Sequence, residues 1–292
     1  MRRVLIIIAA LSLAACARSG DGKSAADAPL RFTAIPDQNS TELQEKFAPL
    51  ERHLSSVLGV PVQFVAARDY QASVEMFVNG DVDLAWYGGL TGVQARNKVP
   101  GARAVAQGDV DPQYCSYFIA HKDTGLVASD TFPASIARYT FTFGSEQSTS
   151  GRLMPEHFIR AQTGRSPQEF FQNPVGFSGS HDKTLELVGS GQYQVGVVNY
   201  KVYDQRVKDG KIDADVVRII WRTPRYADYN WTVRPDLDTK HGSGFTGKLT
   251  QALLDIKDPV LLAALPRERL VAASNDAYDA IRNVAQQLDM LR

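Results

Sequence analysis

The sequence predicts an α/β protein with two lobes, the first of which is discontinuous in the chain. After residue 30, short apolar runs alternate with amphipathic ones, as they do in βαβ units. A longer apolar strand at residues 114–121 leads out of the first unit, and a Pro- and Tyr-rich stretch at residues 223–228 suits a return crossing. The 292 residues suffice for about two domains of ordinary size. We therefore expect a first lobe of residues 30–117 and 225–292, a second lobe of residues 118–224, and two hinge crossings.

The first lobe begins with a strand and a well-marked helix. Residues 39–58 carry apolar side chains at helical spacing. Asn39, with Glu42 three residues later, forms a capping signature at the start of this helix, and Gly59 marks its end. The same kind of pattern predicts strands at residues 30–35, 60–66, 83–86 and 102–107, and helices at residues 39–58, 70–78 and 90–97.

The second lobe repeats the alternation, and the end of the chain has helical spacing. We expect strands at residues 114–121, 139–143, 174–177, 193–198 and 216–221, helices at residues 151–163, 182–188 and 202–208, and mainly helix over residues 245–292. In sheets of this kind ligands bind beyond the carboxyl ends of the strands, and a cleft between two lobes is a favoured place. The ligand cleft is therefore expected between the lobes.

The N-terminus carries a targeting signal. Arg2 and Arg3 precede an apolar run of about ten residues, which is too short to span a bilayer but fits a secretory signal peptide. Leu13-Ala14-Ala15-Cys16 resembles the lipobox of bacterial lipoproteins, in which the Cys carries the lipid. We expect a signal peptide at residues 1–15, lipid on Cys16 and a flexible tether at residues 16–29; a plain signal peptide with an incidental Cys is the alternative. The second cysteine, Cys115, is then alone and is expected to be a buried thiol.

The charge of the chain argues against nucleic acid as a partner. The whole sequence has 32 basic and 32 acidic residues, and removal of residues 1–15 takes away Arg2 and Arg3, leaving 30 against 32. A protein that binds nucleic acid would present a basic face. An anionic ligand would have to be held by local donors and dipoles.

The strongest internal motif is a polar loop between a strand and a helix, at residues 141–151. Three hydroxyl residues in a row, Ser148, Thr149 and Ser150, stand at the expected helix start, where free backbone N–H groups and a partial positive charge favour an anion. Simple N-capping is the alternative, although one hydroxyl is enough for a cap. The loop is not a P-loop, because Gly-x4-Gly-Lys-Ser/Thr is absent and Arg152 stands in place of the lysine.

Four motifs in order give the chain a family resemblance. It resembles the periplasmic phosphonate- and phosphite-binding proteins of ABC importers in Asp69-Tyr70 before a helix, in Asp83-Leu84-Ala85-Trp86-Tyr87-Gly88 at a strand end, in Ser148-Thr149-Ser150-Gly151 followed by Pro155, and in Gly179-Ser180-His181. The resemblance covers almost the whole chain from residue 30 to the last helix. It implies a type II periplasmic-binding fold that closes on its ligand by hinge motion, and an ABC permease with its ATPase as partners.

The resemblance also assigns roles to individual residues. It implies that Tyr70 and Tyr87 donate phenolic hydrogen bonds from the first lobe. Ser148, Thr149 and Ser150 would supply hydroxyls and amides from the second lobe, and His181 one more donor. Each residue has an ordinary structural alternative: Tyr70 as cover for a helix end, Tyr87 as lobe core beside Trp86, and His181 as a capping or surface residue.

Departures from the family pattern bear on the ligand. Members that take aminoalkylphosphonates place acids against the amine; Asp228 lies near one such position, but Asn199-Tyr200 stands at the other. A simpler oxyanion such as phosphite, phosphate, methylphosphonate or selenate is therefore expected, and residues 226–231 resemble a subgroup proposed to bind selenate. Asp228 is equally interpretable as a hydrogen-bond acceptor in the hinge.

We predict a binding protein and not an enzyme. None of the five histidines has the spacing of a metal-ligand motif, and the sequence around a nominal Ser148–His181–Asp228 triad builds no strained nucleophile turn. We expect no metal and no cofactor, and a monomer that is lipid-anchored in the periplasm or cell envelope. A sensor that serves a membrane kinase is an alternative with the same fold, and a serine hydrolase is a remote one.

Overall fold

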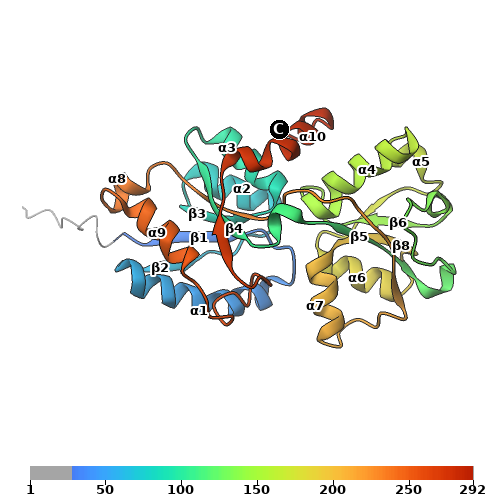
Figure 1. Cartoon of the computed structure of the whole chain (residues 1–292), viewed down its shortest axis with the longest axis horizontal. Helices are drawn as coiled ribbons and strands as arrows, with labels where there is room; N and C mark the ends of the chain where they lie inside the picture. The colour runs from blue at the N-terminus through green and yellow to red at the C-terminus, as the bar shows by residue number, and fades with distance from the viewer. Residues whose placement is uncertain (1–27, 292) are drawn as a thin grey trace, which may run out of the picture.

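The computed structural model describes residues 28–291 and arranges them as two α/β lobes side by side, each around its own sheet (Figure 1). The first lobe has a six-stranded sheet in the order β11-β4-β10-β3-β1-β2. Its strands are β1 (Leu30–Ala34), β2 (Val62–Phe64), β3 (Leu84–Tyr87), β4 (Arg103–Gly108), β10 (Asn230–Val233) and β11 (Leu270–Ala272). Its helices are α1 (Ser40–Leu58), α2 (Tyr70–Asn79), α3 (Gly89–Lys98), α8 (Leu237–His241), α9 (Phe245–Leu254) and α10 (Asp279–Gln287).

The second lobe has a five-stranded sheet in the order β7-β6-β8-β5-β9. Its strands are β5 (Ser116–His121), β6 (Phe141–Phe143), β7 (Gly176–Phe177), β8 (Val195–Asn199) and β9 (Val217–Arg222). Its helical elements are the π-helical turn η5 (Thr149–Leu153), α4 (Met154–Thr163), α5 (Pro167–Phe170), α6 (His181–Gly189) and α7 (Tyr200–Lys208). The predicted α/β class is thus confirmed, with strands from both ends of the chain in the first sheet.

The predicted capping residues are found at both ends of α1. The Asn39 side chain accepts hydrogen bonds from the amides of Thr41 and Glu42, and Gly59 ends the helix with φ +75°. A left-handed backbone of this kind costs a glycine little, because it has no Cβ. The apolar face of α1 packs Phe47 against Phe32 of β1, with ring centroids 5.6 Å apart.

The C-terminal part differs from the prediction in two places, one element that was missed and one helical prediction that was partly wrong. Strand β10 was not predicted, although it lies between β3 and β4 and runs antiparallel to both. The helical prediction for residues 245–292 holds for α9 and α10 but fails between them, where an irregular segment leads into strand β11. A strand as short as β10 has too little sequence of its own to be recognised, and its partners supply most of its stability.

The two crossings between the lobes run side by side. Tyr114 and Tyr226 exchange both backbone hydrogen bonds, at 2.8 and 3.0 Å, and the amide of Asp228 donates to the carbonyl of Asp111 at 3.0 Å. Strand β5 begins at Ser116, so the predicted limit after residue 117 falls inside a strand of the second sheet. The exact limits of the lobes stay a prediction.

The predicted signal peptide, the lipidated Cys16 and most of the tether lie outside the described residues. Within residues 28–291, no helix has the length and apolar character that a membrane crossing needs. Cys115 is a buried free thiol, as predicted, and burial raises its pKa.

Candidate ligand-binding site

The hydroxyl loop of the second lobe lies where the sequence places it, between β6 and α4. Ser148 is the N-cap of η5, and its Oγ accepts a hydrogen bond from the amide of Gly151 at 2.9 Å. Thr149 and Ser150 follow within the turn, and all three side chains are buried. One hydroxyl therefore makes the cap, and the other two are surplus to capping.

His181, the first residue of α6, lies against this loop. A Cβ placed on Gly151 would lie 2.9 Å from Ser148 Oγ and 3.1 Å from His181 Cε1, so only glycine allows the approach. Burial lowers the pKa of His181 to about 4, which keeps the ring neutral at physiological pH. Its Nδ1 accepts from the amide of Asn199 at 3.4 Å, so the single ring proton is on Nε2. Nε2 is buried and has no hydrogen-bond partner among the described residues.

This tautomer argues against the nominal hydrolase triad. In a Ser-His-Asp triad the second ring nitrogen donates to the acid, whereas Nδ1 of His181 is an acceptor. Ser148 Oγ is an acceptor for Gly151 in the same way. The site is built to donate hydrogen bonds, not to activate a nucleophile.

Asp228 brings a carboxyl to the same place from the second crossing. Its Oδ1 accepts from the amide of Gly89 at 2.9 Å, and its buried Oδ2 has no partner within the described part of the chain. Burial raises the pKa of Asp228 to about 7, and the carboxyl of Asp111 acts in the same direction. The Gly89 amide, Thr149 and Arg267 oppose this rise. A group with this pKa exchanges its proton near neutral pH.

Tyr70 contributes an unpartnered phenol from the first lobe. It is the first residue of α2, whose N-cap Asp69 accepts from the amide of Ala72 at 2.7 Å. Tyr70 Oη is buried and has no hydrogen-bond partner among the described residues. Burial raises its pKa well above the usual value; Asp37 adds to the rise and the Ser148 side chain opposes it. The phenol therefore remains a donor, and it faces the hydroxyl loop.

Tyr87 is placed differently from the other predicted site residues. Its hydroxyl donates to the carbonyl of Ser73 at 2.7 Å, and its ring meets Phe77 edge-on. The single hydroxyl proton of Tyr87 is thus donated within the first lobe. The structure therefore does not bring this donor to the group formed by Tyr70, His181 and Asp228. The other predicted residues are brought together.

The start of α3 joins the two lobes, and sequence reasoning missed its part in the site. The amide of Leu90 donates to Thr149 Oγ1 at 2.9 Å, and the amide of Gly89 donates to Asp228. A Cβ on Gly88 would lie 3.0 Å from Thr149 Oγ1 and 3.2 Å from Asp228 Oδ1. The partners of these two amides are 59 and 139 residues away and carry no local signal.

The donors of the site are uncharged, and none of the site residues that the structure describes is a lysine or an arginine. Arg152, next to the hydroxyl loop, forms an ion pair with Glu156 and lies over the ring of Phe143, with its Cζ 4.6 Å from the centroid. No group of three or more His, Cys, Asp or Glu side chains within residues 28–291 is placed to hold a metal ion. Neutral hydroxyl, imidazole and amide donors suit an oxyanion whose oxygens each need a hydrogen bond.

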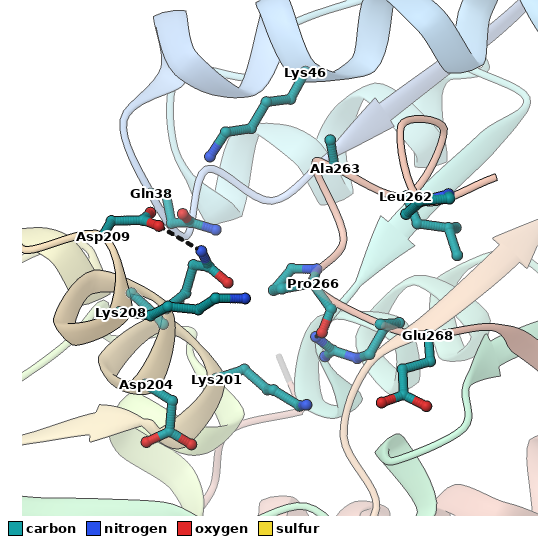
Figure 2. Close-up of a pocket in the computed structure, with 14 residues that line it drawn as sticks. Gln38, Lys46, Lys201, Asp204, Lys208, Asp209, Leu262, Ala263, Pro266 and Glu268 are labelled. Atoms are coloured by element: carbon teal, nitrogen blue, oxygen red, sulfur yellow. Dashed lines mark hydrogen bonds between the residues drawn. The ribbon is translucent and has the colours of Figure 1, made fainter.

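A groove between the lobes is separate from this site. It measures about 570 Å³ and lies between α7, the start of α1 and the segment before β11 (Figure 2). Lys201 and Lys208 extend into it from α7 and Lys46 from α1, while Asp204, Asp209 and Glu268 supply charges of the opposite sign. The groove contains none of the predicted site residues.

The raised pKa of Asp228 predicts a pH dependence of stability in the ligand-free protein. The folded chain holds a proton on Asp228 up to about pH 7, whereas an unfolded aspartate loses it near 3.8. Stability should therefore fall as the pH rises through 7, by about 1 kcal/mol between pH 6.5 and 8. Urea unfolding of the wild type and of Asp228→Asn over this range checks the slope, because histidines titrate alike in both proteins and their contribution cancels in the comparison. In Asp228→Asn the slope should vanish; an unchanged slope would assign it to another group.

Comparisons with known proteins agree with this geometry. The family model for the periplasmic phosphonate substrate-binding protein of ABC transporters matches residues 32–278. A relative from Prochlorococcus marinus, named as a probable ABC transporter phosphite binding protein, is 37% identical over 90% of this chain and 91% of its own length.

Two solved structures extend the comparison. The Prochlorococcus marinus protein in complex with methylphosphonate has a TM-score of 0.84 and 36% identity, covering 90% of this chain and 98% of that one. A binding component of a Pseudomonas aeruginosa ABC phosphonate transporter has a TM-score of 0.78 at 22% identity, with 91% and 88% covered, and supports the fold alone. The predicted type II periplasmic-binding fold and the predicted role as a binding protein are thereby confirmed. The chain belongs to the family of periplasmic phosphonate substrate-binding proteins of ABC transporters, which are not enzymes.

Proposed function

We propose that this protein captures a small tetrahedral oxyanion between its lobes and delivers it to the permease of an ABC importer. The expected ligands are phosphite, methylphosphonate or phosphate, with selenate as a further member of the same shape class. The Prochlorococcus marinus relative, whose structure contains methylphosphonate, supports this class of ligand.

The observation that carries the proposal is a set of three buried polar atoms on segments that meet at the hydroxyl loop. Tyr70 Oη, His181 Nε2 and Asp228 Oδ2 are buried and have no partner among residues 28–291. Buried polar atoms are otherwise almost always hydrogen-bonded, so three at one place favour a polar ligand between them. Thr149 and Ser150, whose side chains are buried, follow Ser148 in the same turn.

The ligand is held by both lobes, and we infer that the lobes close on it. The hydroxyl loop, with His181, forms one half of the site, and Tyr70 with the start of α3 forms the other. Bonds between the halves, such as Leu90 N–H to Thr149 Oγ1 and His181 N–H to the Asp37 carbonyl at 2.9 Å, belong to a closed form. Hinge bending in the paired crossings would open it.

The substituent on the phosphorus should be small and uncharged. Asn199 stands where amine-binding members carry an acid, and both polar atoms of its side chain are hydrogen-bonded within the protein. Its Nδ2 donates to Tyr229 Oη at 2.9 Å, and its Oδ1 accepts from the amide of Val202 at 2.7 Å. Tyr229 in turn donates to Asp37 at 2.7 Å. Position 199 therefore offers a committed amide, and not a carboxylate, to a ligand ammonium group.

We further propose that lipid on Cys16 keeps the protein at the membrane of the periplasm or cell envelope, close to its permease and ATPase. A single acyl chain anchors weakly, whereas several hold a protein firmly. The protein is expected to act as a monomer, with the tether of residues 16–29 between the lipid and the first lobe.

Calorimetric titration of residues 29–292 tests the proposal. The ligands are phosphite, phosphate, methylphosphonate, sulfate, selenate and 2-aminoethylphosphonate. We expect saturable binding of at least one phosphorus oxyanion, weakened about tenfold to hundredfold by Tyr70→Phe or Ser150→Ala, because each removes a hydrogen bond to a charged group.

Tyr139→Phe is the matched control for this titration. Tyr139 Oη donates to the carbonyl of Thr124 at 2.8 Å, away from the site, so this variant loses a phenolic hydrogen bond without touching the ligand. Absence of binding across the whole panel would contradict the oxyanion proposal. Equal losses in Tyr70→Phe and Tyr139→Phe would contradict the assignment of the site.

A further inference from the structure

Gln94 makes a contact between the lobes that lies outside the ligand site. It is a buried residue of α3 in the first lobe. Its Nε2 donates one hydrogen bond to Gln147 Oε1 and another to the carbonyl of Met290, each at 2.8 Å. An amide nitrogen has two protons, so both are used.

The orientation of this amide pair is determined by chemistry. A backbone carbonyl only accepts, so the group that faces Met290 must be the NH₂ of Gln94. The same NH₂ faces Gln147, which must then present its side-chain oxygen. A glutamine and a glutamate at position 147 would both offer such an oxygen, whereas a methionine would not.

The position of Gln147 connects this contact to ligand binding. Gln147 belongs to the second lobe and directly precedes Ser148, the first residue of the hydroxyl loop. Gln94 and Met290 belong to the first lobe, on α3 and just after α10. The hydrogen bond from Gln94 to Gln147 therefore exists only while the two lobes are together.

We propose that Gln94 and Gln147 form a closure latch that sets how long the cleft stays shut on its ligand. Both are positioning residues, because neither belongs to the group of donors that faces the ligand. A hollow of about 430 Å³, lined in part by Gln147, Glu146 and Met290, lies beside the pair, so water can replace the bond once the lobes part. The proposal rests on the proposed function, since it requires closure around an oxyanion.

A latch has a kinetic signature that differs from that of a ligand donor. It stabilises the closed complex and not the encounter, so its loss should speed dissociation and leave association unchanged. Because it does not touch the ligand, it should change the affinities for methylphosphonate and phosphite by the same factor. A loss of fold stability alone would not produce this combination.

Stopped-flow fluorescence with methylphosphonate and with phosphite tests the latch. In Gln147→Met we expect dissociation about three- to tenfold faster for both ligands, an unchanged association rate and an unchanged melting temperature of the ligand-free protein. Gln147→Glu, which keeps an acceptor oxygen, should stay near wild type. Glu146→Met is the matched control, because Glu146 is the exposed neighbour of Gln147 and makes no hydrogen bond to α3 within the described part of the chain.

The outcomes separate the latch from the proposed function. If the wild-type protein binds neither ligand, the proposed function fails and the latch fails with it. If the wild type binds but Gln147→Met dissociates at the wild-type rate, only the latch is overturned. Equal acceleration in Gln147→Glu and Gln147→Met would also overturn it, because the effect would then not depend on the acceptor oxygen.

Discussion

Replacing Gly88 with alanine is expected to weaken oxyanion binding about tenfold to hundredfold while the ligand-free protein stays folded. The new Cβ would lie 3.0 Å from Thr149 Oγ1 and 3.2 Å from Asp228 Oδ1, both closer than ordinary carbon–oxygen contact. Overpacking of this kind costs about 1–3 kcal/mol, which corresponds to the expected range in affinity. Gly88 has φ −71°, so the alanine itself introduces no backbone strain.

The effect should depend on closure, because Thr149 comes from the other lobe. In the open form that we propose, Thr149 would move away from position 88 and the methyl group would lose its closest contact. Calorimetry with methylphosphonate measures the affinity, and thermal unfolding without ligand measures the stability of the ligand-free protein. Gly247→Ala is the matched control, since a Cβ there meets nothing within 4 Å and the residue lies in helix α9. Unchanged affinity in Gly88→Ala would contradict the close approach of the lobes at this point.

Replacing Asp228 with asparagine is expected to change how binding depends on pH. Asp228 Oδ2 faces the donors of the site, and burial raises the pKa of this carboxyl to about 7. A carboxylate and an oxyanion dianion repel each other, so the complex must hold one proton between them, on the carboxyl or on the ligand. Wild-type affinity for methylphosphonate should therefore fall as the pH rises above 7, approaching about tenfold per pH unit.

The asparagine variant removes the need for that proton. Its carbonyl oxygen can still accept from the Gly89 amide, as Oδ1 of Asp228 does at 2.9 Å, and its NH₂ can donate to the ligand at any pH. We expect a flat pH profile above 7 and, at pH 9, binding at least tenfold tighter than wild type. Titrations at half-unit steps from pH 6.5 to 9 measure both slopes. A variant that kept the wild-type slope would assign the proton to another group, such as Asp37, whose pKa burial raises to about 6.

Much of the architecture was predictable because its signals are local. The caps of α1, the alternation of β1 to β4 with helices, and the strand–loop–helix around residues 141–163 depend on side chains within a few positions of one another. Strand β10 and the irregular segment before β11 were missed for the opposite reason. Strand β10 is stabilised by β3 and β4, whose residues are more than 120 positions away.

The candidate site divides in the same way. Residue types at a helix start marked the hydroxyl loop as a candidate, the family resemblance added Tyr70, His181 and Asp228, and the comparisons confirmed the family. The sequence could not indicate that Tyr87 donates to Ser73 inside its own lobe, because the choice between two acceptors depends on where the ring lies after packing.

By itself, the sequence determined the α/β class, the succession of elements and the family of binding proteins, because helix caps, hydrophobic periodicity and ordered motifs are properties of neighbouring residues. Only the tertiary structure decided which nitrogen of His181 carries its proton, why Gly88 must lack a Cβ, and that Gln94 meets Gln147. Each of these depends on a contact between segments that are far apart in the chain. Such contacts are determined when the two lobes pack, and no local pattern encodes them.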